Sequence, residues 1–193
     1  MKLAAFDDGR VGVVLGDELV DVTATLPSGL DLMPLQRINW LVGHWASLQE
    51  AVRAAAMSGR RLPLSSVRLL AANPCPPHVF AAPANYRKHI GELGDRVVTK
   101  KGRTAREQGF FLKAPGSVVG AGAVIGLPKG SSRRFDHESE LAVIIGKAGR
   151  DIPRSKAMDH VFGYACLIDA TMRIEKDVAE EERSMRKSFE GFT

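Results

Sequence analysis

Cysteine is scarce in this sequence of 193 residues, which contains only Cys75 and Cys166. Two cysteines so far apart match neither a disulfide framework nor the paired ligands of a zinc site. Long apolar runs are also missing, since no stretch reaches the ~18 apolar residues that a transmembrane helix needs. The apolar start, residues 1–6, is too short for a signal peptide. These absences predict a cytoplasmic protein without disulfide bonds or membrane contact.

Aromatic residues make up only 6% of the sequence, and none lies within the densest group of basic residues, 96–106. Segments that bind nucleic acid usually combine positive charge with aromatic side chains that stack on bases. We therefore predict no nucleic-acid partner, although the formal charge is +5. The surplus positive charge indicates a solvated loop or attraction of an anionic small substrate.

The first part of the sequence predicts a small N-terminal β-hairpin and helix domain. Residues 2–22 hold three short apolar segments separated by glycine-containing pairs that suit tight hairpin turns. Residues 38–57 carry apolar side chains at helical spacing. A proline-rich stretch follows, and we place the domain boundary within it, so that residues 1–70 form the first domain and residues 71–193 the second.

The second domain is predicted to be rich in strands. The strands that the pattern indicates are residues 79–82, 110–113, 138–145 and 161–169. Short helices are expected at residues 86–93 and 155–160. The whole chain is therefore predicted to have an α+β fold that is mainly β.

Two glutamates on the predicted strand 138–145 are candidates for a metal site. Glu138 and Glu140 lie two positions apart, so they project from one face of a strand. The next apolar strand ends in Asp169, an acid that is costly to bury without a partner. Three carboxylates with water suit Mg²⁺ or Mn²⁺ and leave positions for substrate oxygens. The spacing alone also fits an ordinary surface strand, on which alternate side chains, including both glutamates, face water.

His89 and Glu92 are candidates for acid–base chemistry. On a helix these two residues would share a face, and such a pair can orient and polarise a water molecule. An exposed pair without a function has the same spacing. Lys113 and Lys187 could each bind a carboxylate or an oxyanion, although most lysines are merely solvated.

Taken together, these segments resemble the fumarylacetoacetate hydrolase family. The likeness rests on short motifs whose order and spacing agree throughout residues 79 to 189. These motifs are Asn85-Tyr86 with His89 and Glu92, residues 111–120, residues 138–146, residues 163–169 and the Arg-Lys-Ser-Phe sequence at 186–189. Each motif alone is weak, but the combination is specific. Residues 1–70 resemble the variable N-terminal module of the family.

The resemblance implies a role for each candidate residue. The implied metal ligands are Glu138, Glu140 and Asp169, for Mg²⁺ or Mn²⁺ in solution, with Ca²⁺ as a substitute in a crystal. The pair implied to activate water is His89 with Glu92. The residues implied to hold the substrate carboxylate or an oxyanion are the catalytic Lys187 together with Arg173, Lys113 and Asn85.

The activity implied by the resemblance is metal-dependent hydrolysis of a carbon–carbon bond in a 2,4-diketo acid during the breakdown of aromatic compounds. The substrate would be an acylpyruvate such as fumarylpyruvate, maleylpyruvate or fumarylacetoacetate. An isomerase or decarboxylase of a 2-hydroxy-diene-dioate is an alternative, because these reactions share an enolate. A non-catalytic metal- or ligand-binding protein is the alternative of another class. Family members are generally dimers, so a homodimer is expected.

The resemblance also implies the architecture, a mixed β-roll or sandwich with a small N-terminal β/α module. Family members normally continue well past the motif at 186–189, whereas this sequence has four further residues and stops at Thr193. The C-terminal part of the usual fold is therefore expected to be absent from this chain.

Overall fold

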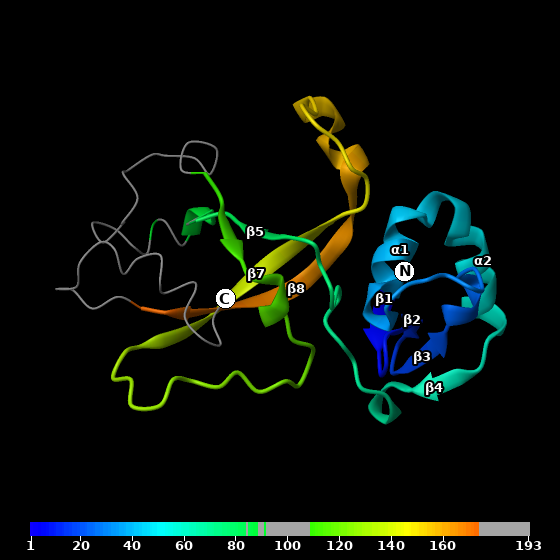
Figure 1. Ribbon diagram of the computed structural model, residues 1–193, viewed down its shortest axis with the longest axis horizontal. Coiled ribbons are helices and arrows are strands. Elements are labelled where there is room, and N and C mark those ends of the chain that lie inside the picture. The colour runs from blue at the N-terminus through cyan, green and yellow to red at the C-terminus, as the bar shows by residue number, and fades with distance from the viewer. Residues whose placement is uncertain (84, 89–90, 92–108, 174–193) are drawn as a thin grey trace.

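The computed structural model describes residues 1–83, 85–88, 91 and 109–173 (Figure 1). Within these ranges the chain is mainly β, with α-helices in its N-terminal part, as the sequence predicts. No helix in the described ranges is both long enough and apolar enough to cross a membrane. Cys75 and Cys166 are both free thiols.

The N-terminal part contains a four-stranded antiparallel sheet. Its strands follow the order β1 (Lys2–Phe6), β2 (Arg10–Leu15), β3 (Glu18–Asp21) and β4 (Arg61–Pro63). Gly9 turns the first hairpin at φ +87°, and a Cβ there would lie 2.5 Å from the Pro34 backbone. The three predicted strands of this hairpin module are thus confirmed. The short β4 was not predicted, because three residues that end in proline carry too little pattern.

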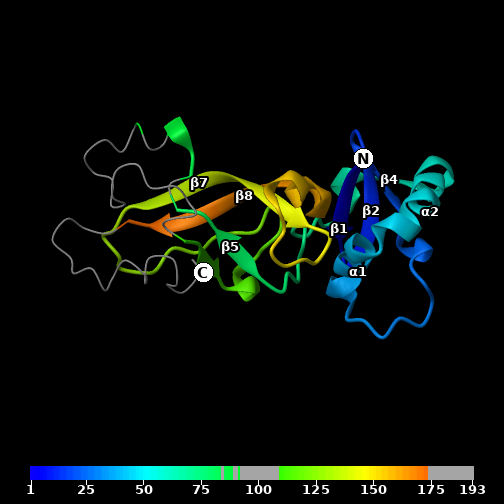
Figure 2. The same cartoon turned by 90° about the horizontal axis from the view of Figure 1, so that it is seen from above.

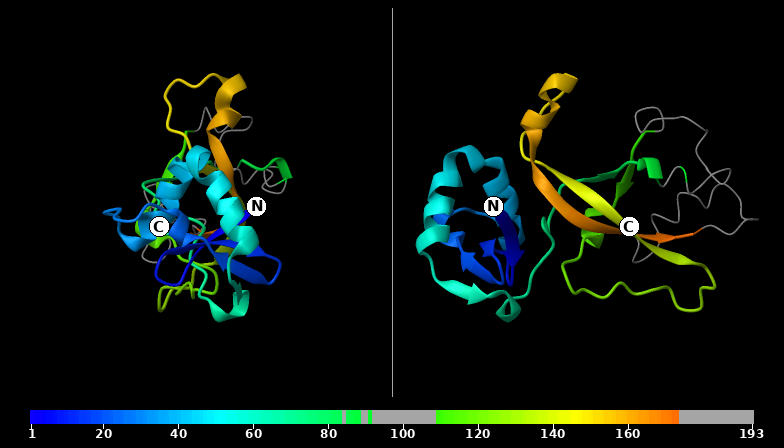
Figure 3. Two further views of the ribbon diagram at one scale, coloured as in Figure 1. Left: turned by 90° about the vertical axis from the view of Figure 1, so that its right-hand side faces the viewer. Right: turned by 180° about the vertical axis from the view of Figure 1, so that it is seen from behind.

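Two helices cover this sheet, α1 (Arg37–Gly43) and α2 (Trp45–Ser58) (Figures 1 and 3). The sequence predicted one continuous helix over 38–57, whereas the structure divides it at His44, whose φ of −112° and ψ of 18° are not helical. The core between helices and sheet includes Val13, Leu41 and Val52, all nearly inaccessible to solvent. Burial of this apolar surface stabilises the module.

The second part of the chain contains two antiparallel strand pairs. The short pair is β5 (Val79–Ala81) with β6 (Phe111–Lys113), and the long pair is β7 (Phe135–Ile145) with β8 (Val161–Met172). The long pair forms a ribbon that runs away from the N-terminal part (Figure 2). All four predicted strands are therefore confirmed, and the last two are longer than expected. The predicted helix at 155–160 is a 3-10 helix, Arg154–His160.

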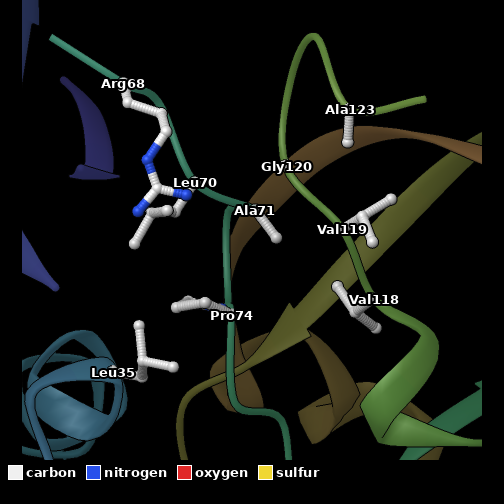
Figure 4. Close-up of a pocket in the computed structure, with 9 residues that line it drawn as sticks. All are labelled: Leu35, Arg68, Leu70, Ala71, Pro74, Val118, Val119, Gly120 and Ala123. Carbon is white, nitrogen blue, oxygen red and sulfur yellow. The ribbon is translucent and has the colours of Figure 1, made fainter. Parts of the chain in front are cut away.

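The two parts of the chain touch at several points. The rings of Trp45 and Phe162 meet edge to face with centroids 5.4 Å apart. The Asn39 amide donates a hydrogen bond of 2.5 Å to the Cys75 carbonyl oxygen. A mostly apolar hollow of about 340 Å³ lies between residues 68–74 and 118–123 (Figure 4). The domain boundary after residue 70 stays a prediction.

Candidate functional site

The register of the β7–β8 ribbon brings the predicted acids onto one face. Glu138 lies directly opposite Asp169, and Asp136 lies opposite Thr171. Directly opposed residues of an antiparallel pair project to the same side, with Cβ atoms roughly 4.5–5.5 Å apart. Glu140 is two positions beyond Glu138 on β7, so it belongs to the same face. We call this face, which carries 136, 138 and 140 of β7 and 169 and 171 of β8, the acidic face.

The acidic face is the protected side of the ribbon. Asp169 is 7% exposed and Thr171 is fully buried, while Glu138 and Glu140 are half-buried. On the opposite face, side chains such as Leu141 are exposed. The alternation therefore does not fit the alternative in which both glutamates face bulk water.

Arg173, just beyond β8, binds two carboxylates of the acidic face. Its Nε donates to Asp136 Oδ2 at 2.7 Å, and a terminal nitrogen donates to Glu138 Oε1 at 2.5 Å. Arg134 also donates to both carboxylate oxygens of Asp136, with bonds of 2.9 and 2.6 Å. The hydrogen bonds from Arg134, reinforced by Arg173, outweigh desolvation and lower the pKa of Asp136 to about 2. Arg173 was predicted to bind substrate, and the structure places its guanidinium at the edge of the acidic face.

Lys113, the last residue of β6, reaches the acidic face from the neighbouring strand pair. Its Nζ donates to Asp169 Oδ1 at 2.9 Å, and the two side chains are only 12% and 8% exposed. A buried charge requires such a partner, because its desolvation is costly. The structure thus joins β6 to β8 through a residue that was predicted only as a substrate contact.

The three predicted metal ligands share a face but are not gathered as a ready site. Among the residues that the structure describes, no three His, Cys, Asp or Glu side chains lie close enough to hold an ion. Glu138 and Asp169 instead contact Arg173 and Lys113. The donor set still fits a hard cation, because Glu138, Glu140 and Asp169 offer only carboxylate oxygens. Their role as ligands stays a prediction.

The segment that begins at Asn85 is attached to β7 through Tyr86. The Tyr86 hydroxyl oxygen accepts a hydrogen bond of 2.9 Å from the backbone N–H of Leu141, the residue after Glu140. Asn85 itself is exposed. His89, Glu92 and Lys187 lie outside the described residues, so their predicted roles stay predictions.

Three residues of this region were given no role by the sequence analysis. Asp136 and Thr171 both continue the two-residue alternation of the acids, and this signal was available in the sequence. Thr171 donates from its hydroxyl to Glu138 Oε2 at 2.8 Å. The contact of Tyr86 with β7 spans 55 positions, and no local pattern predicts it.

Comparison with known proteins matches the part of the chain that carries the acidic face to a known family. Residues 78–193 match the family described as fumarylacetoacetate (FAA) hydrolase, C-terminal. This range contains β5 to β8 and every predicted site residue.

Two maleylpyruvate hydrolases match over the whole chain. The protein from Aquipseudomonas alcaligenes is 38% identical over 201 residues, which are 67% of its length. The crystal structure of the Sphingobium sp. SYK-6 protein, in complex with manganese(II) and pyruvate, is 37% identical with a TM-score of 0.79. This chain spans 64% of that structure. The 5-carboxymethyl-2-hydroxymuconate delta-isomerase of Mycobacterium smegmatis is 25% identical, with a TM-score of 0.57 over 95% of this chain and 58% of its own.

Proposed function

Because the chain belongs to the fumarylacetoacetate hydrolase family, we propose that its protein hydrolyses a carbon–carbon bond of an acylpyruvate, with maleylpyruvate as the first candidate. The observation that carries this proposal is the acidic face itself, in a chain 37% identical to a protein that binds manganese and pyruvate. Pyruvate is the product expected from an acylpyruvate. The chain covers 64% of the length of that relative. The activity is therefore proposed for the whole protein, and not for these 193 residues alone.

The proposed metal ligands are Glu138, Glu140 and Asp169, with Mg²⁺ or Mn²⁺ as the ion. When bound, such an ion supplies Lewis-acid stabilisation of negative charge on substrate oxygens. The position of Glu138 opposite Asp169, with Glu140 on the same face, supports this assignment. The all-oxygen donor set favours a hard divalent cation over zinc or copper.

Arg173 and Lys113 are proposed to bind the anionic part of the substrate. Both are cations at the acidic face, where Arg173 contacts two carboxylates and Lys113 contacts one. A guanidinium can hold a carboxylate through two parallel N–H donors, whereas an ammonium acts as a compact charge. We assign the substrate carboxylate to Arg173 and an adjacent oxygen to Lys113, with Asn85 as a further polar contact.

The proton transfers are assigned to residues outside the described ranges. An imidazole nitrogen of His89, oriented by the Glu92 carboxylate, takes a proton from water as its oxygen attacks the carbonyl carbon distal to the pyruvate unit. The carbon–carbon bond breaks, and its electron pair becomes the enolate of pyruvate, which then takes up a proton. Lys187 is proposed to stabilise the negative oxygen that develops in this step. The products are pyruvate and a second acid.

An assay with two readouts tests the proposal. The purified full-length protein, supplied with Mn²⁺, is mixed with maleylpyruvate. The loss of enol absorbance is followed together with pyruvate, which is measured by coupled reduction with lactate dehydrogenase. We expect one pyruvate for each substrate consumed. An absorbance change without pyruvate would reject hydrolysis.

Isomerisation is the second candidate function, favoured by the likeness to the Mycobacterium smegmatis delta-isomerase. The same acidic face could serve it, because both reactions pass through an enolate of a keto-acid. The assay separates the two when 5-carboxymethyl-2-hydroxymuconate is the substrate, since isomerisation shifts its absorbance without producing pyruvate. A non-catalytic binding protein would take up Mn²⁺ and leave both substrates unchanged.

The homodimer stays a proposal, which sedimentation velocity tests.

A further inference from the structure

We propose that Thr171 is a positioning residue that fixes the carboxylate of Glu138 for metal binding. The inference rests on the proposed function. Thr171 is fully buried, with 0% exposure, and its hydroxyl donates to Glu138 Oε2 at 2.8 Å. In this role Thr171 contacts Glu138, the proposed metal ligand, and does not itself touch the substrate or the ion.

The strand register places the Thr171 side chain next to the proposed ligands Glu138 and Asp169 on the acidic face. Thr171 lies two positions beyond Asp169 on the same face of β8, diagonal to Glu138 on β7. A hydroxyl has one proton to donate. Two acceptors lie within hydrogen-bond distance of the Thr171 hydroxyl, the Glu138 carboxylate at 2.8 Å and the Asp169 backbone carbonyl at 3.2 Å. The shorter bond to the charged acceptor is the stronger one.

Glu138 is held from two sides, and the two contacts differ in charge. Arg173 binds one oxygen of the Glu138 carboxylate and Thr171 binds the other. A cation beside a ligand carboxylate opposes the approach of a divalent ion, because like charges repel at short range. The neutral Thr171 hydroxyl does not repel the ion. It can keep its hydrogen bond while Glu138 offers a remaining lone pair to the ion.

The stiffness of Thr171 suits this task. A β-branched side chain has restricted rotation about χ1, especially when buried within a strand. The hydroxyl is therefore fixed relative to β8, and through it the Glu138 carboxylate is fixed relative to Asp169. Partners that orient metal ligands in this way usually change metal affinity by about 10- to 100-fold when removed.

The test compares three variants by calorimetric titration of the full-length protein with Mn²⁺ alone. Thr171→Val keeps the shape and removes the hydroxyl, whereas Thr171→Ser keeps the hydroxyl. Thr23→Val is the matched control, since the Thr23 hydroxyl also donates to a carboxylate, Asp21 Oδ1 at 2.6 Å, but in the N-terminal sheet. We expect Thr171→Val to raise the Mn²⁺ dissociation constant about 10- to 100-fold at an unchanged number of sites per chain. Thr171→Ser and Thr23→Val are expected to bind Mn²⁺ as the wild type does.

The outcomes separate positioning from simple structural support. A Thr171→Val protein with fewer sites per chain but the wild-type dissociation constant would overturn the inference, because only the folded fraction would have changed. A Thr171→Val protein that binds Mn²⁺ with wild-type affinity at full stoichiometry would also overturn the inference. The proposed function would stand in that case, provided that the wild-type protein cleaves maleylpyruvate. Wild-type protein that takes up no Mn²⁺ would remove the proposed metal site and the inference together. Loss of affinity in Thr171→Val, with rescue in Thr171→Ser, supports it.

Discussion

Lys113 and Asp169 form an ion pair of 2.9 Å in which both side chains are almost withdrawn from solvent. Its two residues come from different strand pairs, β6 and β8, so the contact joins the short pair to the long ribbon. The same pair places a positive charge against a proposed metal ligand. The contact therefore has consequences for both stability and metal binding.

Replacing Lys113 with Met is expected to destabilise the protein. Removal of one partner leaves the Asp169 carboxylate buried beside fewer positive charges, which typically costs about 3 kcal/mol of unfolding free energy. A divalent ion at the proposed site would supply positive charge to Asp169, so the loss of unfolding free energy is expected to be smaller in saturating Mn²⁺. Urea unfolding with and without Mn²⁺ measures both effects.

The control for this prediction is Lys156→Met. Lys156 and Asp159 form a 3.7 Å pair whose side chains are 68% and 59% exposed, and exposed pairs contribute little to stability. Unfolding curves of Lys113→Met that match those of the control would contradict the buried ion pair.

Glu140→Gln and Asp169→Asn are each expected to reduce Mn²⁺ affinity more strongly than the about 10- to 100-fold loss that is typical of residues one step removed from the ion. Each change removes the negative charge of a proposed ligand and keeps nearly the same shape. Calorimetric titration measures the dissociation constant. The matched control is Glu18→Gln, because Glu18 pairs with Arg61 at 2.8 Å in the N-terminal sheet. Unaltered Mn²⁺ binding by both site variants would exclude them as ligands.

Arg173→Lys is expected to raise KM for the acylpyruvate by about 10- to 100-fold, the equivalent of one charge-assisted hydrogen bond. Lysine keeps the charge but cannot present two parallel donors to a carboxylate. Steady-state kinetics in saturating Mn²⁺ measure the change. Arg150→Lys, at a side chain that is 94% exposed, is expected to leave KM unchanged. Equal KM values for the two variants would argue against substrate binding by Arg173.

Tyr86→Phe is expected to lower kcat about fivefold, because a lost neutral hydrogen bond is worth roughly 1 kcal/mol. The Tyr86 hydroxyl accepts from the Leu141 N–H and so attaches the segment leading to His89 to the strand of Glu138 and Glu140. Mn²⁺ affinity is expected to stay as in wild type. Tyr164→Phe is the control, since Tyr164 lies on the opposite face of the ribbon and is 55% exposed. The same kcat for both tyrosine variants would contradict this attachment.

The arrangement of β7 could be predicted from sequence, because a strand period of two places Glu138 and Glu140 on one side whatever the strand pairs with. The position of Asp169 opposite Glu138 could not be derived in this way. It depends on the register between β7 and β8, which shifts by one residue at Ile144 and Ile145. A one-residue change in register would move Asp169 to the other face.

Two further features of the structure were not predicted from the sequence. The break at His44 divides a segment whose apolar spacing alone is continuous, and the His44 ring lies over Trp40 with centroids 4.0 Å apart. In the sequence, Thr171 is an ordinary strand residue, and only the structure shows that its hydroxyl donates to the Glu138 carboxylate. The contact between Thr171 and Glu138 arises only once β7 and β8 have paired.

The central claim is that the acidic face holds a divalent cation, and anomalous diffraction at the manganese absorption edge tests it most directly. Crystals of the full-length protein grown with Mn²⁺ are expected to show an anomalous peak contacted by oxygens of Glu138, Glu140 and Asp169. A peak bound by other residues, or none at this face when Mn²⁺ is saturating, would contradict the account.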